Sequence, residues 1–180
     1  LKFYHKKEIK NSGHSDGVCA TSSGARAPCP LYRTLEAAAA RGLDFIAVTD
    51  HNTVSHLNEL AALQLSFDQI AIIPAQEVTT YHGHMNVFGA AAPVDFRLDE
   101  NYTPHVSDIV DAVARQGALV SINHPGISLT QGCPGCGWSA DLAPDTQIDA
   151  IEVVNGVIAR WGDGPEGPAS SIPFWIAQLN

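Results

Sequence analysis

The chain has 180 residues, which suits one domain with room for a buried core. Hydrophobic residues make up 45% of it, a composition that excludes a disordered chain. Ten basic and nineteen acidic residues give a net charge of -9, which argues against nucleic acid or an anionic membrane as the main partner. We therefore expect a single domain over residues 1–180 that takes a small-molecule substrate and has no nucleic-acid or membrane partner.

The first ten residues differ from the rest of the chain. All four lysines lie there, and every later basic residue is an arginine. This segment is either a solvated strand edge, which lysine protects from pairing with other strands, or a piece that is not native coding sequence. No apolar run approaches the roughly 20 residues of a membrane helix, and no secretory signal opens the chain. A cytoplasmic and an exported bacterial protein both stay open.

The chain alternates helical patterns with short apolar runs typical of buried strands, after a loop rich in Gly, Ser and Pro over residues 11–30. The predicted helices are Leu31–Arg41, Thr53–Leu65, His105–Gln116 and Ile172–Asn180. The predicted strands are Leu43–Thr49, Ile70–Pro74, Glu77–Thr80, Met85–Ala90, Ala118–Ile122 and Ile148–Val154, with a long loop over 123–147. Such an alternation predicts right-handed crossovers and a mainly parallel α/β sheet or barrel.

Four potential metal ligands lie at or beside the ends of predicted strands. His51, Glu77 and His124 follow apolar runs, and His84 introduces another strand. In α/β folds the loops at the carboxyl ends of strands converge over one crevice, so we expect these residues to come together. Imidazole and carboxylate suit zinc, manganese or iron(II), and Glu77 could bridge two ions. A water bound between such ions becomes acidic enough to act in hydrolysis.

The other histidines have more ordinary explanations. His14 and Asp16 lie in a Gly/Ser loop, where a ligand pair and an Asp-Gly turn explain the pattern equally well. We expect the remaining ones at the surface (His56), in a turn (His82), at a helix start (His105) or in a structural or solvated position (His5).

Five segments match a known family in order and spacing: FIAVTDHNT (Phe45–Thr53), PAQEVTT (Pro74–Thr80), GHMNVFG (Gly83–Gly89), SINHPG (Ser121–Gly126) and IDAIEVVNG (Ile148–Gly156). Together they resemble the PHP (polymerase and histidinol phosphatase) superfamily, most closely its carbaryl-hydrolase-like CehA/McbA branch. The resemblance covers residues 11–180 and implies a distorted (β/α)7 barrel holding two or three divalent ions (Zn, Mn or Fe). It implies a metallohydrolase in which a metal-bridged hydroxide attacks a phosphate ester, or a carbamate or carboxylic ester.

The resemblance also implies roles for individual residues. His51 becomes a ligand of one ion and Glu77 the bridging carboxylate, so these two act in catalysis through the metal. His84 and His124 complete the ligands of another ion. Ser15-Asp16-Gly17 matches an SDG motif of the family, which favours Asp16 as a ligand with His14 close behind. The residues implied to orient the histidines are Asp50, Asn52 and Asn123, whereas Glu152 and Asn155 fit a motif without an assigned role.

The chain departs from the family pattern at both ends. A His-x-His pair is absent from Tyr4–Lys10, and a Ser-Asp-x-His motif is expected beyond Asn180, where the sequence stops. We therefore expect a barrel without its C-terminal strand or strands. It would have one well-formed ion site at Glu77, His84 and His124 and one partial site. The alternative is a non-catalytic PHP-like domain that binds a metal or ligand.

The four cysteines leave several interpretations open. Cys133 and Cys136 form a CxxC pair, which could join Cys19 and Cys29 in a structural zinc site. A disulfide between Cys19 and Cys29 would suit an exported protein. A redox CxxC is less favoured because the motif does not open a helix after a strand.

Overall fold

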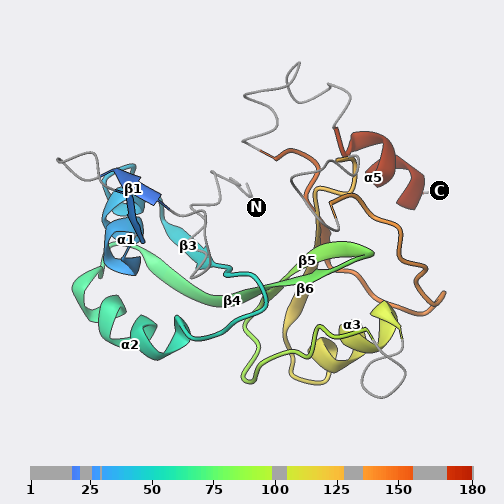
Figure 1. Cartoon of the computed structure of the whole chain (residues 1–180), viewed down its shortest axis with the longest axis horizontal. Helices are drawn as coiled ribbons and strands as arrows, with labels where there is room; N and C mark the ends of the chain where they lie inside the picture. Colours follow the sequence, from blue (N-terminus) through green and yellow to red (C-terminus); the bar gives the residue numbers. More distant parts are fainter. Residues whose placement is uncertain are drawn as a thin grey trace. The chain divides into compact units, whose positions relative to one another are not determined.

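The computed structural model describes residues 30–98, 105–127, 136–155 and 170–179, together with the backbone of 18–20 and 26–28. The chain divides into two compact units, with the boundary between Glu77 and Val78, and each unit is described by itself (Figure 1). Across these described ranges, no helix combines the length and the apolar character needed to cross a membrane.

The first unit contains a parallel strand pair and two helices. Strand β3 (Phe45–Val48) pairs in parallel with β4 (Ala71–Thr80), and the register sets Val48 beside Pro74. Helices α1 (Leu31–Ala39) and α2 (Leu57–Ser66) supply the apolar side chains that pack with β3. The buried core of this unit consists of Leu31, Leu35, Ala38, Val48, Leu60, Phe67 and Ile70. Burial of these aliphatic and aromatic groups is the main stabilising contribution here.

Helix α2 begins at Leu57 and not at Thr53, where the pattern predicted its start. The hydroxyl of Thr53 accepts a hydrogen bond from the Ser55 backbone N–H at 3.2 Å, a local bond that competes with the helix. The ring of His56 reaches the carbonyl oxygen of Ala75 at 2.9 Å. His56 is only 7% exposed, so the expectation that it lies at the surface is wrong.

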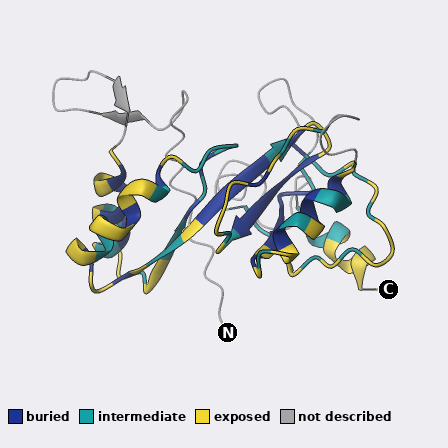
Figure 2. Ribbon diagram, turned by 90° about the horizontal axis from the view of Figure 1, so that it is seen from below, coloured by how far each residue is buried: buried dark blue, intermediate teal, exposed yellow. Residues whose placement is uncertain are grey.

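The second unit is built on β5 (Gly83–Phe88), β6 (Leu119–Asn123) and β7 (Ala150–Ile151). β5 and β6 are antiparallel, and β6 and β7 are parallel. Helix α3 (Val106–Ala114) is apolar on one side and turns its buried residues to the core, while its outer side is exposed (Figure 2). The core comprises Val78, Met85, Val87, Val94, Val106, Ile109, Val110, Val113, Ala118 and Val120.

Helix α3 starts where the sequence predicted. The backbone N–H of His105 donates to the Asp108 carboxylate at 2.9 Å, which satisfies a group at the helix N-terminus. The position expected for His105, at the start of a helix, is thus confirmed.

The strands are hydrogen-bonded in the order β3-β4-β5-β6-β7, which makes this a mixed α/β chain whose sheet is open in the described residues. The expectation of a mainly parallel sheet is wrong at β5, which runs antiparallel to β6. Only the two-residue turn Tyr81–His82 separates β5 from β4. Parallel neighbours need a crossover of about a dozen residues or more, so this turn is too short for a parallel pair. The strands predicted over Ile70–Pro74 and Glu77–Thr80 are one strand, β4. A closed (β/α)7 barrel is not seen in the described part of the chain.

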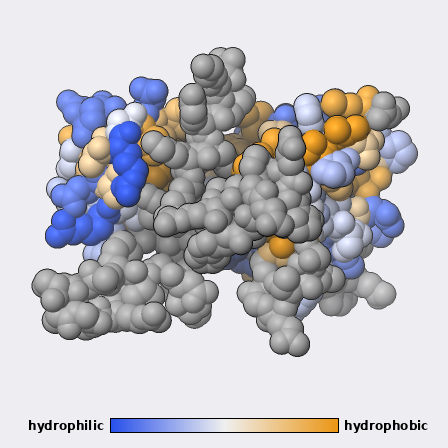
Figure 3. Space-filling view, turned by 90° about the horizontal axis from the view of Figure 1, so that it is seen from above, coloured by the Kyte–Doolittle hydropathy of each residue, from blue (hydrophilic) through white to orange (hydrophobic). Residues whose placement is uncertain are grey.

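The remaining elements are short. β1 (Val18–Ala20) and β2 (Arg26–Pro28) pair antiparallel, so the loop predicted over 11–30 contains a small hairpin. Helix α5 (Ile172–Gln178) confirms the helix predicted near the end of the sequence. It buries none of its residues, and its exposed apolar side chains include Trp175 and Ile176. Figure 3 shows hydrophobic residues among hydrophilic ones on the face that it draws.

Candidate metal centre

The register of β3 and β4 places His51 opposite Glu77 in the first unit. The parallel pairing continues past Val48 as a bridge between these two residues. The Glu77 N–H donates to the Asp50 carbonyl at 3.1 Å, and the Asn52 N–H donates to the Glu77 carbonyl at 2.9 Å. His51 Nε2 lies 3.5 Å from Glu77 Oε2, with the imidazole 30% exposed and the carboxylate 0% exposed. An imidazole open to solvent thus stands beside a buried carboxylate.

Asp50 and Asn52 flank His51, and their role in orienting metal ligands stays a prediction. Asp50 Oδ2 lies 3.2 Å from Nδ1 of the buried His56, whose Nε2 faces the Ala75 carbonyl. Since a carbonyl oxygen only accepts, His56 Nε2 carries a proton. Asn52 has a left-handed backbone with φ 52°, which asparagine tolerates better than most residues. Asp50 therefore supports the start of α2 through His56.

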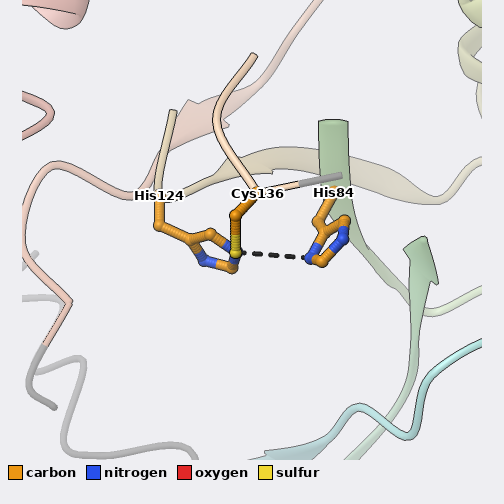
Figure 4. A group of neighbouring side chains, drawn as sticks. All are labelled: His84, His124 and Cys136. Atoms are coloured by element: carbon orange, nitrogen blue, oxygen red, sulfur yellow. Dashed lines mark hydrogen bonds between the residues drawn. The ribbon is translucent and has the colours of Figure 1, made fainter. Parts of the chain in front are cut away.

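The second unit brings two histidines into contact. In the antiparallel register His84 of β5 stands opposite Asn123 of β6, and His124 follows directly. His84 Nδ1 and His124 Nε2 are 3.3 Å apart, and the two rings are nearly perpendicular, at 87°. Each histidine is only 3% exposed. Figure 4 shows their rings turned toward one another, with Cys136 beside them.

Glu152 orients the ring of His124. The pairing of Ile122 with Ile151 brings Glu152 to the same sheet edge. Glu152 Oε2 accepts from the His124 N–H at 2.9 Å and lies 2.9 Å from His124 Nδ1, and both residues are buried. Because a carboxylate accepts, Nδ1 carries a proton, and in the neutral imidazole the lone pair of Nε2 then faces His84. A carboxylate behind the ring is usual for histidines that bind metals.

The spacing of the two nitrogens fits a tetrahedral ion. Zinc binds histidine nitrogen at about 2.0–2.1 Å, so two such ligands at the tetrahedral angle lie about 3.3 Å apart. His84 Nδ1 and His124 Nε2 are separated by 3.3 Å. The same separation is also within hydrogen-bonding distance, so the two rings contact each other directly in the absence of an ion. The donors and their spacing therefore suit a divalent ion.

Cys136 is a third potential ligand here, whereas the sequence suggested it only as a ligand of a zinc site with the other cysteines. The ligand atoms of His84, His124 and Cys136 all lie within 4.8 Å of one another, and Cys136 is 4% exposed. Cys136 is disulfide-bonded, and its partner lies outside the described side chains. A zinc site made from all four thiolates is therefore wrong for this form, because a disulfide sulfur is no thiolate.

The structure reports on most of the other predicted residues. His82 lies in the turn before β5, as expected, and its carbonyl accepts from the Ser139 N–H at 2.8 Å. Asn123 is buried at the end of β6, opposite His84. His14 and Asp16 lie outside the described residues. The ligand set of Glu77, His84 and His124 draws on both units and stays a prediction.

The role of Glu152 also escaped the sequence analysis. The one signal in the sequence was its place directly after a short apolar run, where the other candidate ligands also lie. Cys136 does not follow a predicted strand, because it lies in the long loop predicted over 123–147. The strand pattern therefore gave no indication that it lies near His84 and His124.

No family model matches the chain. Among curated proteins it is similar to the uncharacterized protein MJ1587 of Methanocaldococcus jannaschii, with 26% identity over 123 residues. The match covers 67% of this chain and 63% of that protein, so the chain spans less than two thirds of the relative's length.

Two solved structures are similar to part of the chain, both with a TM-score of 0.47. One is a protein of Bifidobacterium adolescentis provisionally described as a metal-dependent phosphoesterase, with 15% identity over 68% of this chain and 71% of that one. The other is a two-domain protein of Bacteroides vulgatus that contains a predicted PHP-like metal-dependent phosphoesterase, with 23% identity over 73% of this chain and 43% of that one. At this level of similarity, neither the fold nor the activity of those proteins carries over to this chain.

Proposed function

We propose that the chain belongs to a metal-dependent hydrolase of the PHP superfamily, of the CehA/McbA type. Its substrate would be a small-molecule phosphate ester, or a carbamate or carboxylic ester. The observation that carries this proposal is the buried His84–His124 pair, with nitrogens 3.3 Å apart and Glu152 behind one ring. The motifs around TDHNT, GHMN and NHP support it. In this proposal the open sheet is part of a distorted (β/α)7 barrel.

Each unit contributes residues that suit a divalent ion. His84 and His124 would hold one ion through the nitrogens that face each other. His51 and Glu77 would hold another, joined by Asp16 or His14. A net charge of -9 attracts cations to the protein as a whole. Zinc, manganese or iron(II) all accept such nitrogen and oxygen donors.

The bound ion and the protein would contribute differently to hydrolysis. A bound divalent ion supplies Lewis acidity and lowers the pKa of water toward neutrality. The protein's own part is to present ligands in fixed orientations. Glu152 keeps the proton of His124 on Nδ1, and the β3–β4 register keeps the Glu77 carboxylate beside His51. Burial of Glu77, His84 and His124 limits competition by bulk water for these groups.

The test is metal loading followed by turnover. The protein is loaded with Zn²⁺, Mn²⁺ or Fe²⁺, its metal content is measured, and p-nitrophenyl phosphate and naphthyl esters are offered. We expect bound metal and hydrolysis, and a loss of both metal and activity in His84→Ala. His82→Ala is the matched control, because His82 is exposed in the neighbouring turn and should leave both unchanged.

Two results would count against the proposal. Absence of bound metal under every loading condition would reject it entirely. Stoichiometric metal without hydrolysis of either substrate class would reject the enzyme and favour the metal-binding, non-catalytic alternative.

A further inference from the structure

Cys136 is held next to His124 by a close backbone approach. Gly137 has φ +84° and lies so near Ile127 that a Cβ would stand 2.5 Å from the Ile127 carbonyl oxygen. Glycine is needed there both for the left-handed backbone and for this approach. Ile127 N–H in turn donates to the His124 carbonyl at 3.1 Å, so the turn after His124 and the segment after Cys136 pack directly on one another.

A second packing contact holds the same segment next to His84. The indole of Trp138 covers Gly83, where an added Cβ would overlap the six-membered ring. The Ser139 N–H donates to the His82 carbonyl at 2.8 Å, which ties the segment to the turn before β5. The packing of Gly137 on Ile127 and of Trp138 on Gly83 therefore holds Cys136 in place. Its sulfur lies beside both histidines (Figure 4).

We propose that Cys136 is a redox-controlled ligand of the metal held by His84 and His124. In the disulfide form the sulfur is covalently occupied, and only the two imidazoles can donate. Reduction would convert the group into two imidazoles and one thiolate, a donor set typical of zinc sites that keep one position open. The inference rests on the metal binding proposed above for His84 and His124, and goes beyond it by making the site depend on thiol redox state.

A low-molecular-weight thiol can serve as the reductant of the Cys136 disulfide. Two thiol molecules deliver two electrons and two protons to the disulfide, which gives two protein thiols and one oxidised small-molecule disulfide. Cys136 then loses its proton as sulfur binds the metal, so each ion bound releases one proton from this residue. Softer ions such as Zn²⁺ and Co²⁺ gain most from the added thiolate, whereas Mn²⁺ gains least.

Cobalt(II) tests the proposal without any need for turnover. The protein is reduced with dithiothreitol, freed of reductant under anaerobic conditions, and titrated with Co²⁺ beside an unreduced sample. We expect a thiolate-to-cobalt charge-transfer band in the near ultraviolet for the reduced protein and none for the oxidised one. The band should be lost in reduced Cys136→Ser and kept in reduced Cys133→Ser.

Absence of the band in reduced protein that binds cobalt would overturn the inference and leave the metal binding of the proposed function intact. A band that persists in Cys136→Ser would also overturn it, because another cysteine would then be the ligand. If neither the reduced nor the oxidised protein binds cobalt, both this inference and the proposed function are overturned.

Alkylation gives a second readout that does not depend on how the Cys136→Ser variant folds. The reduced wild-type chain is treated with iodoacetamide, and labelling of Cys136 is mapped by peptide mass spectrometry. Saturating Zn²⁺ should block this labelling in the wild type and in His82→Ala, but not in His84→Ala. Equal labelling of the wild type with and without Zn²⁺ would reject the thiolate ligand.

Discussion

Glu152 holds His124 through a single carboxylate oxygen, which accepts from the backbone N–H and lies 2.9 Å from Nδ1 of the same residue. The pair is buried, and the Asn155 amide donates to the other carboxylate oxygen at 3.0 Å. Main chain and ring of His124 are thus oriented together, which limits rotation of the ring. Such an arrangement prepares Nε2 as a donor before any ion binds.

Replacing Glu152 with Gln should weaken metal binding without removing a ligand. We expect the affinity of the His84–His124 site for Zn²⁺ to fall by about 10- to 100-fold. Competition with a chromophoric chelator measures this. Asp149→Asn is the matched control, because the Asp149 carboxylate also accepts from a backbone N–H, that of Val120 at 2.8 Å. Equal affinities for Glu152→Gln and the wild type would contradict the orienting role.

His56→Ala should destabilise the chain. The substitution leaves the Ala75 carbonyl and the buried Asp50 carboxylate without the imidazole that now contacts both. Loss of one partner of a buried polar group costs about 1–3 kcal/mol, more when the group is charged. Urea unfolding followed by circular dichroism measures the change. Ser55→Ala, at an exposed neighbour, should change the free energy of unfolding far less, and similar losses in both variants would argue against the contact.

Gly83→Ala and Gly89→Ala separate a steric effect from a backbone effect. Both glycines have positive φ, +150° and +80°, but only a Cβ at Gly83 would overlap Trp138, whereas Gly89 has nothing within 4 Å. Holding an alanine at such a backbone conformation costs about 1–3 kcal/mol at either position, and overpacking adds about 1–3 kcal/mol at Gly83 alone. Urea unfolding should therefore show the larger loss for Gly83→Ala. The same variant should shift Trp138 fluorescence in a chain whose other two tryptophans are replaced by phenylalanine.

The Asp95–Arg97 ion pair predicts a local pH effect. Two hydrogen bonds from Arg97, at 2.8 and 2.7 Å, lower the pKa of Asp95 from its ordinary 3.8 to about 2. A lowered carboxyl pKa means that the pair stabilises the fold above pH 3.8 and that this contribution is lost as the pH falls toward about 2. Because both side chains are exposed, the contribution is below about 1 kcal/mol.

Arg97→Ala should return the Asp95 pKa toward its ordinary value. An NMR titration of the side-chain carboxyl carbon measures it directly. An unchanged titration curve in the variant would show that the pair does not persist in solution.

The sequence by itself determined most of the helices and strands, although it missed the β1–β2 hairpin and divided β4 into two strands. Apolar spacing is a local property, so it predicted α1 and α3, and the strands β3 and β6, close to their observed bounds. It also identified His51, Glu77, His84 and His124 as candidate ligands, since each lies beside a short apolar run. The prediction that His56 lies at the surface was wrong because it used helical spacing alone. That spacing does not show that the residue precedes α2 or that its ring contacts the Ala75 carbonyl.

Only the tertiary structure decided which side chains meet. The antiparallel direction of β5 sets His84 opposite Asn123, and the parallel pairing of β6 with β7 brings Glu152 to His124. Strand order and register depend on contacts between residues far apart in the chain, which no local pattern contains. Cys136 reaches the histidines for the same reason, through the packing of Gly137 on Ile127 and of Trp138 on Gly83. The sequence thus supplied the donors, and long-range packing decided which of them lie within ligand distance.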